Sequence, residues 1–272
     1  MKILFLSICL DSMPFLPLIH AELRKLPPDI EWRWAVCEGV ALAKHCTHWV
    51  ANQSPRLSID GTGEYLTALE GWEYRLDYFA KRQWNGKIEM VNHPLRLVDG
   101  NWGDEEFLLW QMDGDELWTA EQIVRCWRMF KEQPEKNSAF FWCRYFVGPD
   151  KVIITRDCFG NHPAYEWHRV WKIKPGMLFK THEPPVIEGL KLNPFTHAET
   201  EAQGLVFDHF SYATRAQVAF KEKYYSGPNN PHAPSYAGLP ERWDKFQAET
   251  VWPRSLKEMM PWVGNGCMVD KI

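Results

Sequence analysis

The sequence FLLWQMDGDE at residues 107–116 constrains the fold more than any other segment, because an apolar run ends abruptly in three carboxylates. Four to six apolar residues bounded by Asp and Gly predict a buried strand. Asp113, Asp115 and Glu116 then lie at the carboxyl end of that strand, where open α/β sheets bind ligands. Two carboxylates at this spacing can reach one Mg²⁺ or Mn²⁺, whose remaining ligands are water and phosphate oxygens. The segment therefore predicts a metal site at the edge of a sheet.

Acid-rich turns also occur in other kinds of protein. The simplest alternative for a lone Asp-x-Asp is a solvated turn. An EF-hand calcium loop requires further oxygen ligands and a Gly at fixed spacing, whereas Leu117 and Trp118 follow directly here. A phosphatase with a nucleophilic Asp in an Asp-x-Asp-x-Thr motif is a closer alternative, but Leu117 stands where that Thr belongs and the motif lies in the middle of the chain.

Strand and helix patterns alternate before the acidic segment. Residues 2–10 predict a strand, 15–26 a helix, and 31–36 a second strand that ends at Cys37-Glu38-Gly39. The order strand, helix, strand predicts a parallel pair with a right-handed crossover. We expect a helix over residues 64–83 and a short third strand at 87–91.

Local signals continue the same pattern after the acids. Thr119 and Gln122 form a capping-box sequence ahead of apolar residues at helical spacing, so a helix is expected directly behind the acidic turn. Alternating apolar residues at 138–147 and 152–154 predict a hairpin. Together these elements predict an α/β fold with a mixed, mainly parallel sheet flanked by helices. Pro and Gly become frequent from residue 226 to 240, which predicts a domain over 1–227 and a C-terminal extension over 228–272.

Composition narrows the class of protein. The formal net charge of -4 and the absence of a basic stripe argue against a nucleic-acid partner. The seven cysteines are scattered without a C-x-x-C pair, which is typical of reduced thiols in a cytoplasmic protein. The apolar run at residues 1–10 is short and has no cleavage site, so it predicts a core strand; no segment is long enough to span a membrane. Fifteen Trp residues favour carbohydrate among possible ligands, because sugars bind on aromatic faces.

In the order of its motifs, the chain resembles a glycosyltransferase of the GT-A fold, close to the family-2-like group. The N-terminal strand and helix, Glu38, the segment Asp60-Gly61-Thr62 and the Asp-x-Asp of Asp113 and Asp115 match in order. Thr181-His182-Glu183 stands where related enzymes carry a His-Glu pair, and residues 207–212 resemble their late His segment. The resemblance spans residues 1–225. Glu38 replaces the usual Asp, and the Gln-x-x-Arg-Trp signature of processive synthases is absent from the sequence.

The resemblance implies a Rossmann-like, metal-dependent glycosyltransferase of the hexosyltransferase type, inverting and non-processive. Its donor would be a UDP- or GDP-sugar and its acceptor a saccharide hydroxyl. Mn²⁺ or Mg²⁺ would be held by Asp113, Asp115 and His209. The implied nucleotide contacts are Leu10, Glu38, Asp60 and Gly114.

A hydroxyl acceptor needs a base within hydrogen-bond reach. The resemblance implies Glu183, oriented by His182, with Asp157 and Glu166 as alternatives. Arg144, Arg156 and Arg169 are candidates for the diphosphate, although each also fits a structural ion pair. Trp142, Tyr145 and Trp167 are candidates for an acceptor platform, and each also fits the core.

Two other functions remain open from the sequence. A metal-dependent nucleotidyl- or phosphotransferase could use the same acids, but residues 7–14 contain no Gly-rich Lys or Arg loop. A non-catalytic relative that binds sugars through its Trp-rich surface is the second alternative.

Overall fold

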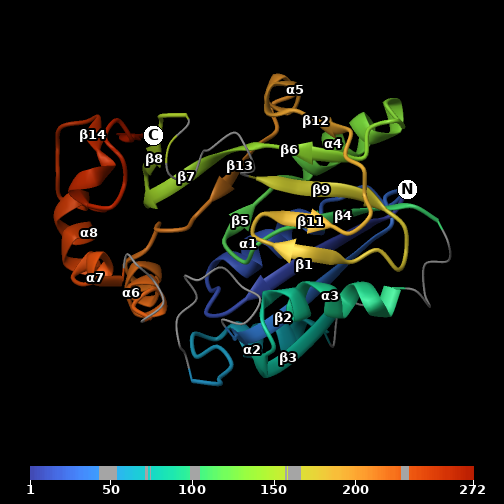
Figure 1. The fold of residues 1–272 in the computed structure, drawn as a ribbon, viewed down its shortest axis with the longest axis horizontal. Helices are drawn as coiled ribbons and strands as arrows, with labels where there is room; N and C mark the ends of the chain where they lie inside the picture. The colour runs from blue at the N-terminus through green and yellow to red at the C-terminus, as the bar shows by residue number, and fades with distance from the viewer. Residues whose placement is uncertain are drawn as a thin grey trace.

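The computed structural model describes residues 1–42, 54–70, 73, 75–98, 105–156, 158, 167–227 and 233–272. Its central feature is a seven-stranded sheet with the strand order β12-β6-β9-β4-β1-β2-β3 (Figure 1). All of these strands except β9 run in the same direction. The predicted α/β fold with a mixed, mainly parallel sheet is therefore confirmed. The strands are β1 (Ile3–Cys9), β2 (Trp32–Ala41), β3 (Leu76–Trp84), β4 (Phe107–Gln111), β6 (Ser138–Phe140), β9 (His168–Ile173) and β12 (Pro194–Phe195).

Helices flank this sheet and a second, six-stranded sheet crosses one end of it (Figure 1). The helices are α1 (Phe15–Leu23), α2 (Thr62–Glu70), α3 (Lys87–Val98), α4 (Ala120–Glu132), α5 (His197–Ala202), α6 (Arg215–Tyr224), α7 (Ala233–Tyr236) and α8 (Leu239–Gln247), with a 3-10 turn η1 (Leu256–Glu258). The second sheet has the order β14-β15-β8-β7-β13-β5. Its strands are β5 (Glu116–Leu117), β7 (Trp142–Gly148), β8 (Lys151–Ile153), β13 (Val206–His209), β14 (Arg254–Ser255) and β15 (Met268–Lys271). Strand β10 (Phe179–His182) pairs with β11 (Pro185–Ile187) in a separate two-stranded sheet that packs against the seven-stranded sheet.

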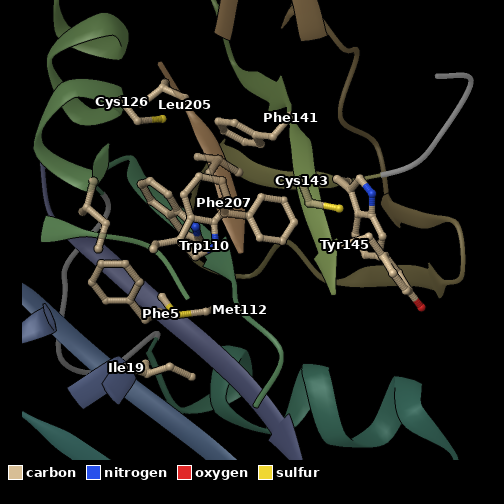
Figure 2. Close-up of a cluster of buried hydrophobic side chains, with 14 of the residues drawn as sticks. Phe5, Ile19, Trp110, Met112, Cys126, Phe141, Cys143, Tyr145, Leu205 and Phe207 are labelled. Carbon is tan, nitrogen blue, oxygen red and sulfur yellow. The ribbon is translucent and has the colours of Figure 1, made fainter. Parts of the chain in front are cut away.

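An aromatic layer joins the two sheets beneath the acidic turn (Figure 2). Trp110 at the end of β4 packs edge-on against Trp118, with ring centroids 4.9 Å apart, and Trp118 stacks on Phe207 of β13 at 4.5 Å. All three side chains are buried. Because Trp110 and Trp118 stand on either side of residues 112–117, their mutual packing anchors the acidic turn at both ends.

Several predicted elements are confirmed. The capping box at Thr119 and Gln122 is formed and begins α4, as predicted. The predicted hairpin is present as β7 and β8, which pair antiparallel. Strand β4 is buried along its whole length, as expected for a strand with neighbours on both sides.

Two predicted elements are wrong. Residues 87–91 begin helix α3 and do not form a strand: Ile88, Val91 and Leu95 recur at helical spacing and pack into one apolar cluster. The helix predicted over 64–83 ends at Glu70, because residues 76–84 form β3 along the open edge of β2. Backbone hydrogen bonds to a neighbouring strand are a tertiary effect, which local sequence patterns do not report.

Strand β2 is longer than expected and places Glu38 inside the sheet. It runs on to Ala41 through an irregularity between Glu38 and Val40. Gly39 lies there at φ +130°, and a Cβ atom would meet the Lys81 carbonyl oxygen at 1.8 Å. Only Gly fits such a bulge, so the glycine that seemed to end the strand instead lets it continue.

The C-terminal residues pack on the second sheet. Strand β15 pairs antiparallel with β8, and Gln247 of α8 donates a hydrogen bond to the Val147 carbonyl oxygen at 2.9 Å. Trp243 of α8 binds the Tyr212 carbonyl oxygen, also at 2.9 Å. The proposed division at residue 227 falls beside residues 228–232, which lie outside the described part of the chain.

Candidate functional site

A cleft opens where β1 and β4 end, which is the carboxyl edge of the parallel part of the sheet. The residues that line it come from the end of β1 and the loop after it (8–12), the acidic turn 113–115, Lys87 and Met90 of α3, and one face of α6; Phe15, Gly39, Ala41 and His182 complete the lining. The α6 residues are Gln217, Phe220, Lys221 and Tyr224. In open α/β sheets such a crevice forms outside the carboxyl ends of two adjacent parallel strands, at the point where the strand order reverses. Asp113 and Asp115 line this cleft, and the ligand site that the sequence predicts there stays a prediction.

Hydrogen bonds hold the acidic turn against β1. The Ser7 hydroxyl donates to the Met112 carbonyl oxygen at 2.6 Å, and the Met112 amide donates to the Leu6 carbonyl oxygen at 2.9 Å. The Glu116 amide closes the turn onto the Asp113 carbonyl oxygen at 3.0 Å. Gly114 lies so close to the loop after β1 that a Cβ atom would be 2.5 Å from the Ser12 hydroxyl oxygen. The two loops that form the floor of the cleft are therefore in direct contact.

Arg169 of β9 fixes two of the three acids from beneath. Its guanidinium binds both carboxylate oxygens of Glu116 at 2.7–3.1 Å and one oxygen of Asp113 at 3.4 Å. Glu116 is fully buried, and burial raises its pKa to about 7 against the opposing effect of Arg169. Arg169 is itself buried, so it positions the acidic turn and does not line the cleft.

His209 of β13 contacts the other acid of the motif. Its Nε2 atom lies 3.5 Å from Asp115 Oδ1, and its ring packs edge-on against Trp167 and Tyr145, each with ring centroids 4.8 Å away. Burial alone would raise the pKa of Asp115, but His209 and Lys221 hold it below its usual range. Asp115 is therefore a carboxylate at neutral pH, and His209 positions it.

The acidic turn fits a divalent cation held by two carboxylates. Asp113 and Asp115 both line the cleft, and Asp113 Oδ1 is buried without a described hydrogen-bond partner. Such an oxygen is costly to bury and is satisfied by a bound cation. In the described part of the chain, no group of three or more His, Cys, Asp and Glu side chains is arranged as a metal site. Two protein ligands are enough for Mg²⁺ or Mn²⁺ when a phosphate supplies the rest.

The two acids expected at the nucleotide are used within the protein. Glu38 is fully buried; one of its oxygens accepts the Ser58 amide at 2.7 Å and the other accepts the Tyr78 hydroxyl. Asp60 accepts the amides of Met13 at 2.8 Å and Thr62 at 3.1 Å. Both acids hold residues 58–62 against the loop after β1 and so shape one side of the cleft. Leu10 and Gly114 do line it.

Glu183 lies at the edge of the cleft and is ion-paired. It follows β10 and binds the Lys87 ammonium, and its Oε1 atom is 3.4 Å from His182 Nδ1. Burial would raise the pKa of Glu183, but Lys87 and His182 lower it well below its usual range. Lys87 and His182 line the cleft, whereas Glu183 stands directly behind them. The alternative bases Asp157 and Glu166 lie outside the described residues.

Most of the other candidates lie away from the cleft. Arg144 pairs with Asp208 on the exposed face of β7. Arg156 pairs with Glu201 and covers the Trp142 ring at 4.5 Å. Tyr145 and Trp167 are buried around His209.

Helix α6 supplies the cleft residues that the sequence analysis did not identify. Thr214 and Gln217 form the capping box that begins the helix. Gln217, Phe220, Lys221 and Tyr224 then follow at spacings of three, one and three, so they share one helical face. That spacing is visible in the sequence, but only the tertiary structure places this face opposite the acidic turn. Lys87 was missed because its segment was interpreted as a strand.

None of the helices in the described ranges combines the length and apolar character needed to cross a bilayer. Five of the six cysteines among the described residues are buried, and Cys46 lies outside these residues.

No protein family and no curated protein matches the chain. Solved structures do. The mannosyltransferase PcManGT from Pyrobaculum calidifontis, in complex with GDP-Man and Mn²⁺, has a TM-score of 0.46 and 11% identity over 92% of this chain and 76% of that one. S. aureus TarS 1-349 has a TM-score of 0.41 and 11% identity over the same shares of the two chains. Its complex with UDP-GlcNAc aligns at a TM-score of 0.36 and 16% identity over 54% of this chain, and the aligned part spans only 35% of that chain. At these TM-scores the function has to be inferred from the residues of the cleft.

Proposed function

We propose that the protein is a glycosyltransferase that moves a sugar from a nucleoside diphosphate sugar to an acceptor hydroxyl. One observation carries the proposal: Asp113, Gly114 and Asp115 form the floor of a cleft at the carboxyl edge of the parallel strands, between lysines on two opposite helices. Carboxylates that hold a cation, together with ammonium groups, are the chemistry that binds a diphosphate. The remaining cleft wall is partly aromatic, which suits a sugar.

Asp113 and Asp115 would hold Mn²⁺ or Mg²⁺ in this proposal. The bound ion would neutralise the negative charge that develops on the diphosphate as it leaves. Arg169 keeps Asp113 in place by one oxygen, and His209 keeps Asp115 in place from behind the cleft. His209, whose Nε2 atom lies 3.5 Å from Asp115 Oδ1, would be the third protein ligand of the ion.

The donor would lie across the contact between the loop after β1 and the acidic turn. Leu10 and Gly114 line this region, and the missing side chain of Gly114 lets the acidic turn pack directly against Ser12 of the loop after β1. Glu38 and Asp60 act indirectly, because their carboxylates hold residues 58–62 in position. A UDP- or GDP-sugar meets these requirements equally.

Glu183 is our proposed general base. The acceptor oxygen forms a bond to the anomeric carbon while the bond from that carbon to the phosphate oxygen breaks, and the electron pair of the broken bond stays on the phosphate. The acceptor proton moves to the Glu183 carboxylate. Lys87 holds this carboxylate in its charged form before the acceptor arrives. Because one base acts with no protein nucleophile, the proposed reaction inverts the anomeric centre.

The acceptor platform is proposed at Phe220 and Tyr224 of α6. Both side chains are partly buried, line the cleft and stack with ring centroids 5.3 Å apart. Trp142, Tyr145 and Trp167 are engaged elsewhere, so these α6 rings replace them as the surface for a saccharide.

Isothermal titration calorimetry with UDP and GDP, each in Mn²⁺ and in chelator, tests the proposal. We expect binding that requires the ion, followed by donor hydrolysis or transfer when the corresponding nucleotide sugars are supplied. Equal affinity in chelator and in Mn²⁺ contradicts metal-dependent binding. Turnover of a nucleoside triphosphate in place of a nucleotide sugar would favour a phosphotransferase instead.

A further inference from the structure

Lys221 of α6 has an unusual environment for a lysine. Its side chain is partly buried and lines the cleft opposite the acidic turn. Its ammonium donates a hydrogen bond to the neutral Ser211 hydroxyl and lies 4.8 Å from the centre of the Tyr212 ring. It takes part in none of the ion pairs formed between described residues. The Asp115 and Asp113 carboxylates attract this ammonium without binding it directly, so its burial still costs free energy, and a bound anion would lower that cost.

The other cations around the cleft are already paired. Lys87 binds Glu183, Arg169 binds Glu116 and Asp113, and Arg56 binds Asp11. Each of these cations would have to leave a carboxylate in order to bind a ligand. Lys221 would not, because Ser211 is neutral and can exchange its partner at low cost. Of these four cations, Lys221 is therefore the best placed to bind an anion.

We propose that Lys221 is a direct ligand of the donor diphosphate, on the side of the cleft opposite Asp113 and Asp115. This inference rests on the proposed function. When the bond between the anomeric carbon and the phosphate oxygen breaks, the electron pair stays on that oxygen, and the Lys221 ammonium stabilises it. A lysine acts as a compact point charge that suits a phosphate whose charge changes during the reaction. The diphosphate is thus held from two sides, by the cation site below and by α6 above.

This arrangement has a consequence for binding without a metal ion. Lys221 should give the protein a residual affinity for diphosphates in chelator. It should also oppose metal binding in the absence of a nucleotide, since its positive charge repels a cation at Asp113 and Asp115. Replacing Lys221 therefore changes the two affinities in opposite directions, whereas a folding defect would weaken both.

The test compares Lys221→Met with Lys223→Met, which removes an exposed lysine two residues along the same helix. Calorimetry measures the binding of UDP, GDP and inorganic pyrophosphate in chelator, and of Mn²⁺ alone. For Lys221→Met we expect diphosphate affinity to fall by about 10- to 100-fold, the effect of one charge-assisted hydrogen bond, while Mn²⁺ affinity rises. Lys223→Met should match the native protein, and Lys221→Arg should recover most of the lost affinity.

The outcomes separate this inference from the proposed function. Equal UDP affinity of the native protein and Lys221→Met overturns the role of Lys221 and leaves the glycosyltransferase proposal intact. Lys221-dependent binding of pyrophosphate with no binding of UDP, GDP or their sugars supports the anion site and overturns the proposed function. If neither nucleotides nor pyrophosphate bind the native protein, both are overturned.

Discussion

Arg169 Nη2 lies 3.4 Å from Asp113 Oδ2, and the other oxygen of the Asp113 carboxylate is buried and accepts no hydrogen bond from a described residue. The guanidinium is held in turn by three hydrogen bonds to Glu116. Asp113 is therefore fixed through one oxygen and has the other available for a ligand. An oriented carboxylate of this kind needs little rearrangement to bind a cation.

The first prediction concerns the two acids that line the cleft. Asp115→Ala should remove most of the difference between nucleotide affinity in Mn²⁺ and in chelator, and Asp113→Asn should weaken donor binding together with turnover. We expect losses of at least about 10- to 100-fold in metal affinity, the range found even for residues that only support metal ligands. Calorimetry with Mn²⁺ and UDP or GDP measures the effect. Asp244→Asn is the control, because this exposed acid of α8 pairs with Arg215 at the start of α6. Metal-dependent binding that survives in Asp115→Ala would move the site elsewhere.

The second prediction tests the contact between the two loops of the cleft floor. In Gly114→Ala the new Cβ atom would lie 2.5 Å from Ser12 Oγ and 2.9 Å from Ser12 Cβ, so one loop has to move. We expect the free energy of unfolding to fall by about 1–3 kcal/mol, as in other overpacked sites, and nucleotide affinity to fall with it. Urea denaturation and calorimetry measure both quantities.

Two variants control the Gly114 experiment. Gly264→Ala adds the same methyl group where no atom lies within 4 Å, and it should be close to neutral. The double variant Gly114→Ala with Ser12→Gly removes both clashing atoms and should recover nucleotide affinity. Failure of the double variant to recover any affinity would show that the clash with Ser12 is not the cause.

The sequence predicted the carboxyl edge of the sheet well because the signals there are local. The apolar run of β4, the acids after it and the capping box of α4 are consecutive in the chain, and the structure keeps them together. Those parts of the site that depend on distant segments were not predictable in the same way. Lys221 stands more than 100 residues after Asp115. Its place opposite the acids depends on the pairing of β13 with β7, because α6 follows β13 in the chain.

Glu38 lies in a different environment from the end of a strand, where the sequence predicted it. The position matched a strand-end acid in the sequence, but the Gly39 bulge lets β2 continue and buries the carboxylate beside Ser58 and Tyr78. A bulge depends on the neighbouring strand, here the Lys81 carbonyl of β3, which had been interpreted as helix. One wrong element therefore led to the wrong environment for a second residue.

The third prediction separates chemistry from binding. Glu183→Gln keeps the size of the side chain and removes its basicity, so turnover should fall by roughly 10²–10⁴-fold while donor and metal affinity stay nearly unchanged. The matched control is Glu188→Gln, an exposed acid just after β11 in the same hairpin. Transfer or slow donor hydrolysis is measured alongside donor affinity. Native turnover in Glu183→Gln would place the base at Asp157 or Glu166.

Lys87→Met adds a pH dependence to that experiment. Burial raises the pKa of Glu183 and Lys87 is the largest of the influences that lower it, so removing the ammonium should raise the pKa of this carboxyl. A base is active when deprotonated, so the acidic limb of the rate profile should move to higher pH in Lys87→Met. An acidic limb at the same pH in both proteins would show that Glu183 does not limit the rate.

The last prediction concerns His168, which lies on β9 next to Arg169. Its side chain is buried, stacks on Phe140 with ring centroids 4.1 Å apart, and has no described hydrogen-bond partner at Nε2. Burial, together with the nearby positive charge of Arg169, lowers the pKa of His168 to about 3. The imidazole is thus neutral in the folded protein throughout the ordinary pH range.

The sign of the resulting pH effect follows from proton binding. Between the unfolded pKa of about 6.5 and the folded pKa of about 3 the unfolded chain binds a proton at His168 and the folded chain does not, so stability falls as pH falls through this window. The contribution of one such group is at most about 1.4 kcal/mol per pH unit. In His168→Phe, urea denaturation should show the same difference in the free energy of unfolding from the native protein at pH 7 and at pH 8, because at these pH values the difference reflects packing alone. Below pH 6 the variant should gain stability relative to the native protein as the pH is lowered. A constant difference between the two proteins from pH 8 to pH 4 would mean that His168 takes up its proton equally well in both states and is not sealed in the core.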